Sequence, residues 1–188
     1  MKKILIFLTF ILSMNLCCLA EDIDIEQAYR DMPVPTLKYI HDIDPGENFD
    51  IHNSTWSPYP LFRLTTTLYF KTVEIPPGYY LLTPREQDGK WYVLFKEAGK
   101  VRYAIPVYDK KIVPLNFYDE NLPKPDLKPA AKMQLAWLNF VGNHVKSSKR
   151  KPEANNYLEV TDLENNFISI VLYWGSYKYY MVFRTIRM

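Results

Sequence analysis

The chain has 188 residues, of which 48% are hydrophobic and 23% are charged, and its formal net charge is +2. This apolar content excludes an intrinsically disordered chain, and 14 prolines exclude a long coiled coil because proline breaks helices. A chain of this length is expected to form one globular domain.

The first 20 residues have the three-part pattern of a secretory signal. Lys2 and Lys3 precede a mostly apolar stretch over residues 4–12, and residues 18–20 (Cys-Leu-Ala) close the segment. A charged start, a short apolar stretch and small residues before the cut are typical of such a signal. A transmembrane helix needs about 20 apolar residues, and residues 4–20 are too few. We therefore expect residues 1–20 to be a signal peptide.

Cleavage after Ala20 leaves a chain that begins at Glu21 and has no cysteine, since both cysteines precede the cut. This excludes thiol catalysis, zinc–thiolate sites and cysteine-held iron–sulfur clusters from the mature chain. We expect a periplasmic or secreted protein that contacts the membrane only through the signal peptide before cleavage. Lipidation of Cys17 or Cys18 is the alternative processing.

The charge of the mature chain is divided between two regions. Residues 21–50 carry nine acids and two bases, whereas residues 51–188 carry 19 bases and 12 acids, so their net charges are −7 and +7. The simpler interpretation is a solvated, largely irregular acidic leader over residues 21–60. The alternative is that the acidic segment docks on the basic body, or that each faces a different partner.

The leader contains one segment with helical spacing. Ile25, Ala28 and Tyr29 predict a short helix over residues 24–31, which the Met-Pro-Val-Pro stretch at 32–35 ends. Residues 41–60 are predicted to be irregular, because Asp-Pro-Gly at 44–46 is a turn signal and Ser-Pro-Tyr-Pro at 57–60 is extended.

The body, residues 61–188, is predicted to be a single β-rich domain. Strands are expected where apolar and polar residues alternate and β-branched or aromatic residues are frequent. Residues 90–96 and 101–108 are predicted to form a hairpin through Ala98-Gly99, and Pro106 indicates that the second strand lies at a sheet edge or ends early. The predicted strands are residues 64–71, 79–83, 90–96, 101–108, 157–161, 167–174 and 177–186.

One long helix is predicted over residues 129–145. Met133, Trp137 and Phe140 lie on one stripe of this helix, and further apolar residues widen the stripe, so we expect it to pack broadly against the sheet. The last strands are joined by short links, which indicates an antiparallel meander. The predicted fold class is α+β: an antiparallel, curved β-sheet or partial barrel with one long helix packed on it.

Motifs for metal binding and catalysis are incomplete. Residues 41–52 are rich in acids and begin like a calcium loop at Asp42, but Glu47 and Asn53 stand where that loop needs glycine and glutamate. Ser176 lacks the glycine two residues later that a nucleophile elbow requires. We expect no metal ion and no cofactor.

Nucleic acid is not an expected partner. Four bases within residues 146–151 could touch phosphates or anionic lipid head groups. Such a charge run after a helix is more often a solvated loop, and an exported protein seldom meets nucleic acid.

Aromatic side chains are the remaining functional signal. Of the 29 in the sequence, 27 follow the predicted cut, and the simpler interpretation is that a β-rich core uses them. Tyrosine and tryptophan are also favoured at interfaces, so those beside turns predict a platform for a glycan, a peptide or a protein. The candidate ligand-binding residues are Trp56, Tyr59, Tyr79, Tyr80, Tyr177 and Tyr179.

We therefore expect an exported, non-catalytic binding or envelope-associated module with an unidentified protein or glycan partner. The alternative is a hydrolase that acts on cell-wall or glycan material with a site dispersed in the sequence. An exposed aromatic face would favour binding, whereas two carboxylates facing one another across a cleft would favour the enzyme.

Overall fold

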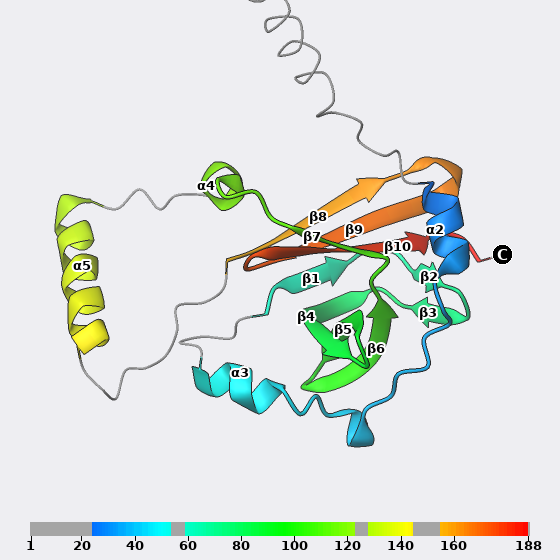
Figure 1. Ribbon diagram of the computed structural model, residues 1–188, viewed down its shortest axis with the longest axis horizontal. Coiled ribbons are helices and arrows are strands. Elements are labelled where there is room, and N and C mark those ends of the chain that lie inside the picture. The colour runs from blue at the N-terminus through cyan, green and yellow to red at the C-terminus, as the bar shows by residue number, and fades with distance from the viewer. Residues whose placement is uncertain (1–23, 54–58, 123–127, 145–154, 188) are drawn as a thin grey trace, which may run out of the picture.

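The computed structural model describes residues 24–53, 59–122, 128–144 and 155–187 (Figure 1). The signal peptide predicted over residues 1–20 lies outside these ranges. The described chain is α+β with antiparallel sheets and more strand than helix, which confirms the predicted class.

The strands follow one another with short connections, except around the helices. The strands are β1 (Leu61–Leu64), β2 (Leu68–Phe70), β3 (Val73–Ile75), β4 (Gly78–Gln87), β5 (Lys90–Glu97), β6 (Lys100–Pro106), β7 (Asp109–Ile112), β8 (Asn156–Asp162), β9 (Phe167–Trp174) and β10 (Tyr177–Arg184). The helices are α2 (Ile25–Asp31), α3 (Glu47–Asn53), α4 (Phe117–Asn121) and α5 (Pro129–His144), with 3-10 turns η1 (Ile40–Asp42) and η2 (Glu164–Asn166).

The strands form two antiparallel sheets. The first has the order β1-β4-β5-β6, and the second has the order β3-β2-β10-β9-β8 with β7 also paired to β10. The predicted hairpin is confirmed as β5–β6, in which Phe95 pairs with Tyr103, and Pro106 ends the edge strand β6. The predicted meander is confirmed as β8–β9–β10, joined by tight links.

The chain passes from the first sheet to the second at two places. One is the break over residues 65–67, so the single strand predicted over 64–71 is wrong: its two halves, β1 and β2, belong to different sheets. The other lies between β6 and β7, where the Val107 N–H donates to the Trp91 carbonyl of β5 (2.9 Å) and the Tyr108 N–H donates to the Tyr180 carbonyl of β10 (3.1 Å). Strands that switch sheets in this way make the corners of closely packed β structures.

The core fills the space between the two sheets. Phe70, Phe95 and Phe183 are fully buried there, and Phe183 meets both of the others edge to face at ring-centroid distances of 6.1 and 6.0 Å. Edge-to-face contact suits aromatic rings because the positive ring edge meets the negative ring face. The predicted use of aromatic residues in a β core is thus one part of their role.

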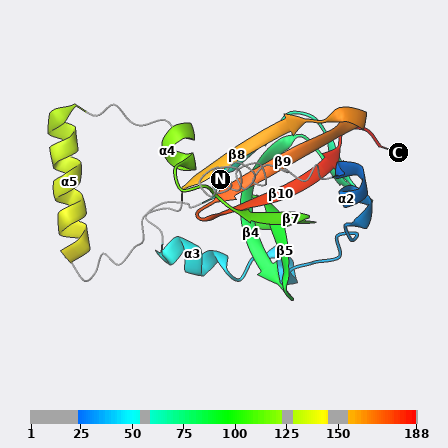
Figure 2. The same ribbon diagram turned by 45° about the horizontal axis from the view of Figure 1, so that its top comes forward.

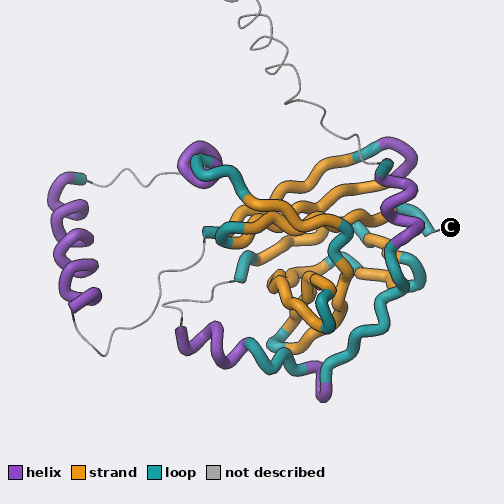
Figure 3. The backbone as a smooth tube through the Cα atoms, viewed as in Figure 1, coloured by secondary structure: helices purple, strands orange, loops and turns teal. Residues whose placement is uncertain are grey.

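The helix α2 closes one end of this core. Asp24 caps it by accepting a hydrogen bond from the Gln27 N–H (3.1 Å), and Tyr29 enters the core between Phe70 and Phe167 at centroid distances of 5.6 and 5.3 Å. The predicted helix over residues 24–31 is confirmed. After α2 the leader continues along the first sheet through η1 to α3, which Figure 3 shows.

The prediction of one long helix packed on the sheet is wrong. A helix is present over Pro129–His144, but it stands apart from both sheets (Figures 1 and 2), and its Met133, Trp137 and Phe140 are 78%, 65% and 56% exposed. The sheets are covered by other segments. The leader packs on the outer face of the first sheet through Leu37 and Tyr39, and α4 packs on the second sheet. No helix in the described ranges is both long and apolar enough to cross a bilayer.

Candidate functional site

Two side-chain groups carry distinctive chemistry: a charge cluster under the leader and an aromatic groove at the junction of the sheets. The charge cluster forms on the outer face of the first sheet. Arg85 of β4 and Lys96 of β5 share this face with Leu94, because directly paired residues of antiparallel strands point to the same side. The turn at residues 44–46 and the helix α3 bring acids over the two bases.

Asp44 is the centre of the charge cluster. Its carboxylate and the Lys96 ammonium are each 1% exposed and lie 2.6 Å apart, and the Arg85 guanidinium donates to the same carboxylate at 3.0 and 3.1 Å. The Gly46 N–H donates to Asp44 at 3.0 Å, which fixes the turn. Asp44 is therefore matched by two cations and one backbone donor.

Two further acids of α3 complete the cluster. Glu47 lies 3.2 Å from the Lys96 ammonium, and Asp50 accepts hydrogen bonds from the Arg85 guanidinium and from the Tyr59 hydroxyl (2.9 Å). The Lys96 ammonium also lies 4.5 Å from the centroid of the Tyr59 ring. The leader thus docks on the basic body, which is the alternative to a solvated leader, and α3 corrects the prediction of an irregular segment over 41–60.

The pKa values in the cluster show how its charges are held. Burial by itself raises the pKa of Asp44, but hydrogen bonds from Arg85 and Lys96 outweigh burial and hold that pKa below its usual value. Burial by itself lowers the pKa of Arg85, whereas its hydrogen bonds to Asp44 and Asp50 raise it above the usual value. Burial and the hydrogen bond to Asp50 raise the pKa of Tyr59. Asp44 and Arg85 therefore stay charged and Tyr59 stays neutral. This suits a structural contact better than proton transfer.

The aromatic groove joins β5, β7 and β10. We define it by Trp91, Lys110, Tyr177 and Tyr179. The Lys110 ammonium lies 3.7 Å from the Trp91 ring centroid, 4.1 Å from that of Tyr177 and 5.8 Å from that of Tyr179. Trp91 and Tyr179 are themselves in contact, with their centroids 5.1 Å apart. A lysine held against three aromatic rings is a cation–π arrangement.

Strand register explains why these residues meet. In the β7–β10 pair, Lys110 lies directly opposite Tyr179, and Tyr177 lies two residues along on the same face. Tyr179 is buried, and burial raises its pKa to about 12, whereas Tyr177 is 42% exposed. The groove therefore has a buried floor and an open side.

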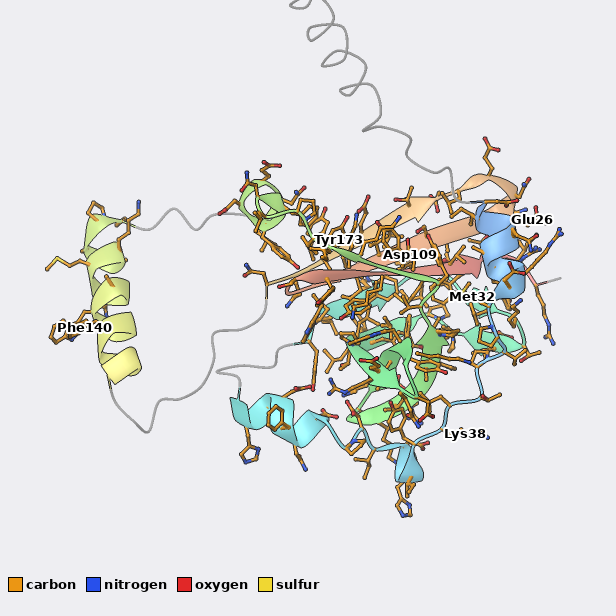
Figure 4. All side chains as sticks on the ribbon, in the orientation of Figure 1. Glu26, Met32, Lys38, Asp109, Phe140 and Tyr173 are labelled. Carbon is orange, nitrogen blue, oxygen red and sulfur yellow. The ribbon has the colours of Figure 1, made fainter. Side chains whose placement is uncertain are left out.

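A hollow of about 360 Å³ opens beside Lys110. Its walls come from the β4–β5 turn, the β6–β7 corner and the leader. Asp109 of β7, one of the lining residues, marks its position in Figure 4. Lys90 and Lys110 supply positive charge, while the Asp109 carboxylate lies 2.9 Å from the Lys111 ammonium. The residues that line the hollow are Pro33, Gly89, Lys90, Trp91, Pro106, Val107, Tyr108, Asp109 and Lys110.

The six predicted ligand-binding residues do not form one platform. Tyr177 and Tyr179 lie together in the aromatic groove. Tyr59 is buried in the charge cluster and stacks on Trp174 (5.8 Å), which pairs directly with Tyr177.

The other three predicted residues lie elsewhere. Tyr80 is buried between the sheets and contacts Phe95, whereas Tyr79 is 58% exposed on β4. Trp56 lies outside the described residues.

Sequence reasoning missed the cationic residues of both groups. Lys96 had one usable signal, since it continues the apolar run Val93-Leu94-Phe95 of β5. A lysine in such a strand must find an acid, and the acidic leader supplies it. Lys110 had no such signal, because its partners Trp91 and Tyr177 are distant in the sequence.

The described residues hold no group of three or more His, Cys, Asp or Glu side chains that could bind a metal ion. Asp44, which lies in the stretch that begins like a calcium loop, faces Arg85 and Lys96 instead. No protein-family model, no curated protein and no solved structure matches the chain.

Proposed function

We propose that the chain is an exported, non-catalytic binding module that acts in the periplasm or outside the cell, with the aromatic groove as its ligand site. The observation that carries this proposal is Lys110, whose ammonium lies over the partly buried Trp91 ring and the exposed Tyr177 ring beside an open hollow. Within the described residues, no carboxylate forms an ion pair with Lys110. Its N–H donors can therefore serve an acceptor from outside.

The groove is suited to a protein segment that carries a carboxylate beside an apolar side chain. Lys90 and Lys110 give the hollow a positive lining, and the carboxylate of Asp109 is engaged by Lys111. Trp91 and Tyr177 offer apolar surface next to that charge. Their ring faces are occupied by the Lys110 ammonium, which disfavours flat stacking of a sugar and favours an acidic peptide segment over a glycan.

The hydrolase alternative has less support. Glycoside cleavage needs two carboxyl groups facing the substrate, one of them able to donate a proton. The acids that the described fold brings together, Asp44, Glu47 and Asp50, are bound to Arg85 and Lys96. Asp44, which is held by both cations, is a poor proton donor because its pKa is lowered.

We also infer that the two sheets form a partial barrel. The β1–β2 and β6–β7 corners carry the chain from one sheet to the other, and the core lies between the sheets. This arrangement places the aromatic groove at the β6–β7 corner, where Trp91 of one sheet meets Tyr179 of the other.

Export is tested by expressing the full chain with a carboxyl-terminal tag and determining its location and amino-terminal sequence. We expect an exported product that begins at Glu21 and lacks added lipid. A product that keeps Met1 and stays in the cytoplasm would contradict the proposal. Lipid attached at Cys17 or Cys18 would instead support the alternative processing and an envelope anchor.

Ligand binding is tested by capturing partners from native envelope extract with the wild-type chain and matched variants. Lys110→Glu should reduce recovery of a protein partner at least tenfold, and Trp91→Ala should do the same. Lys38→Glu and Tyr79→Ala change an exposed lysine and an exposed tyrosine outside the groove, so they should leave recovery unchanged. Equal recovery by all variants, or binding to glycan without any protein, would contradict the proposed site or its ligand.

A further inference from the structure

The exposed face of α5 is the second unexplained surface of the molecule. Met133, Trp137 and Phe140 follow one another at helical spacing, and the Trp137 and Phe140 rings stack with their centroids 6.0 Å apart. Figure 4 shows Phe140 projecting from α5 on the side away from the sheets. Together with Ala130, Gln134 and Ala136 they line one continuous, mostly apolar surface.

Within the described residues 128–144, the charged side chains Lys128 and Lys132 are both basic. Lys128 immediately precedes α5 and Lys132 lies on its first turn, and the Lys132 N–H donates to the Lys128 carbonyl at 3.0 Å. No acid occurs in the helix. In the sequence, the nearest acids on either side are Asp126 and Glu153, and four more bases lie within residues 146–151. An apolar face within such a basic stretch is complementary to a partner that has an apolar interior beneath a layer of anionic groups.

We propose that α5 binds the surface of an anionic lipid bilayer, lying along it with Met133, Trp137 and Phe140 inserted among the lipid chains. Trp and Phe on one face with Lys beside it are typical of helices that lie in the membrane interface. A 16-residue helix is about 24 Å long, less than the roughly 30 Å of a hydrocarbon core. The length therefore suits a helix in the plane of the surface.

This proposal goes beyond the aromatic groove and uses none of its residues. It replaces the expectation that the chain contacts a membrane only through its signal peptide. It also supplies a physical reason for the position of α5. A helix whose apolar face is meant for lipid has no need of a matching face on the sheets, and the sheets are already covered by the leader and α4.

The test measures binding of the chain that begins at Glu21 to vesicles, so that residues 1–20 contribute no membrane affinity. Every described element lies after this start. Vesicles of phosphatidylcholine alone are compared with vesicles that contain equal parts of phosphatidylglycerol and phosphatidylcholine. We expect at least tenfold stronger partitioning to the anionic vesicles, with a blue shift of tryptophan fluorescence and a loss of binding at high salt.

Two pairs of variants separate the apolar and the charged contributions. The double variant Trp137→Ala/Phe140→Ala should weaken partitioning at least tenfold, whereas Ile40→Ala/Leu115→Ala, which removes exposed apolar residues elsewhere, should change it less than twofold. Lys128→Glu/Lys132→Glu should weaken partitioning to anionic vesicles roughly tenfold or more. Lys38→Glu is its single-charge control. Urea unfolding confirms that each variant is folded.

Three results would overturn the proposal: no vesicle binding, equal binding to both vesicle types, or a dimer in sedimentation that Trp137→Ala/Phe140→Ala dissociates in the absence of vesicle binding. The last result would assign the face to a second copy of the chain. Capture of a partner by the aromatic groove does not depend on α5. The two proposals therefore fail separately.

Discussion

The burial of the leader and of α5 is the reverse of what their polarity suggests: the charged segment has buried side chains, and the apolar helix is exposed. The leader carries a net charge of −7, yet Asp44 is 1% exposed and bound to the body, whereas α5 is rich in apolar side chains and presents Trp137 and Phe140 to solvent. The difference is one of complementarity. The outer face of the first sheet offers Arg85 and Lys96, which match acids, whereas the apolar contacts described on the two sheets are made by the leader and α4, not by α5.

Burial of a segment therefore depends on the partner that the rest of the fold supplies. A buried carboxylate is tolerated only when paired and hydrogen-bonded, and Asp44 meets both conditions. An apolar helix is buried only when another apolar surface faces it. Substitutions on each side of this contrast should change the free energy of unfolding by very different amounts.

The largest effect is expected on breaking the buried pair. Asp44→Ala leaves Lys96 buried with only the more distant Glu47 as its acid, and should lower the free energy of unfolding by about 3 kcal/mol in urea titration. The double variant Asp44→Ala/Lys96→Met removes the orphaned charge and should recover part of this loss. Glu97→Ala breaks the exposed pair with Arg102 and should cost less than about 1 kcal/mol. Equal costs for the two acids would show that the leader is solvated.

Acid should remove the same contribution in the wild type. The folded-state pKa of Asp44 is held below its usual 3.8, so the unfolded chain takes up this proton at higher pH than the folded one. The stabilisation is complete above pH 3.8 and is lost as the pH falls through the folded-state value. The difference in unfolding free energy between wild type and Asp44→Asn should therefore narrow below about pH 4. A difference that stays constant from pH 6 to pH 3 would contradict this account.

The close approach of the leader predicts a smaller, steric effect. A Cβ atom at Gly46 would lie 3.0 Å from the Arg85 guanidinium, whose position is fixed by two carboxylates. Gly46→Ala should lower the free energy of unfolding by about 2 kcal/mol, the usual scale of overpacking. Gly99→Ala is not a suitable control, because Gly99 has a positive φ. The informative comparison is Gly46→Ala/Arg85→Ala, in which the added methyl group should cost little beyond Arg85→Ala alone.

The strands were predictable where local pattern decides them. The meander β8–β9–β10 and the hairpin β5–β6 follow from alternation and from turn residues such as Gly99 and Gly175. The break at residues 65–67 was not predictable, since these three threonines favour a strand. The strand is interrupted because β2 pairs in the second sheet whereas β1 pairs in the first. β7 is Asp-Lys-Lys-Ile, with no apolar alternation, and it is a strand because β10 pairs with it.

The candidate sites were less predictable for a related reason. The opposite charges of leader and body indicated docking as one alternative, but nothing local selected Asp44 among the nine acids of residues 21–50, and the one local signal for Lys96, the apolar run before it, does not name its partner. Tyr177 and Tyr179 were found through their place beside a turn. Lys110 and Trp91 join them only because the β6–β7 corner brings two sheets together.

The smallest effect on stability is expected at α5, and it completes the contrast. Trp137→Ala removes a large aromatic side chain that is 65% exposed, so it should change the free energy of unfolding by less than about 0.5 kcal/mol.

Phe117→Ala is the matched test on α4, because its ring stacks on Tyr173 at 4.1 Å with an interplanar angle of 3°. That loss should be about 2 kcal/mol, below the roughly 3–5 kcal/mol of a fully buried aromatic side chain, because Phe117 is only partly buried. If Trp137→Ala were as costly as Phe117→Ala in urea unfolding, α5 would be held against the body in solution. Its apolar face would then not be open to lipid. A small effect at Trp137 together with a large one at Phe117 would mean that aromatic side chains stabilise the fold on α4, whereas on α5 they remain available to bind another surface.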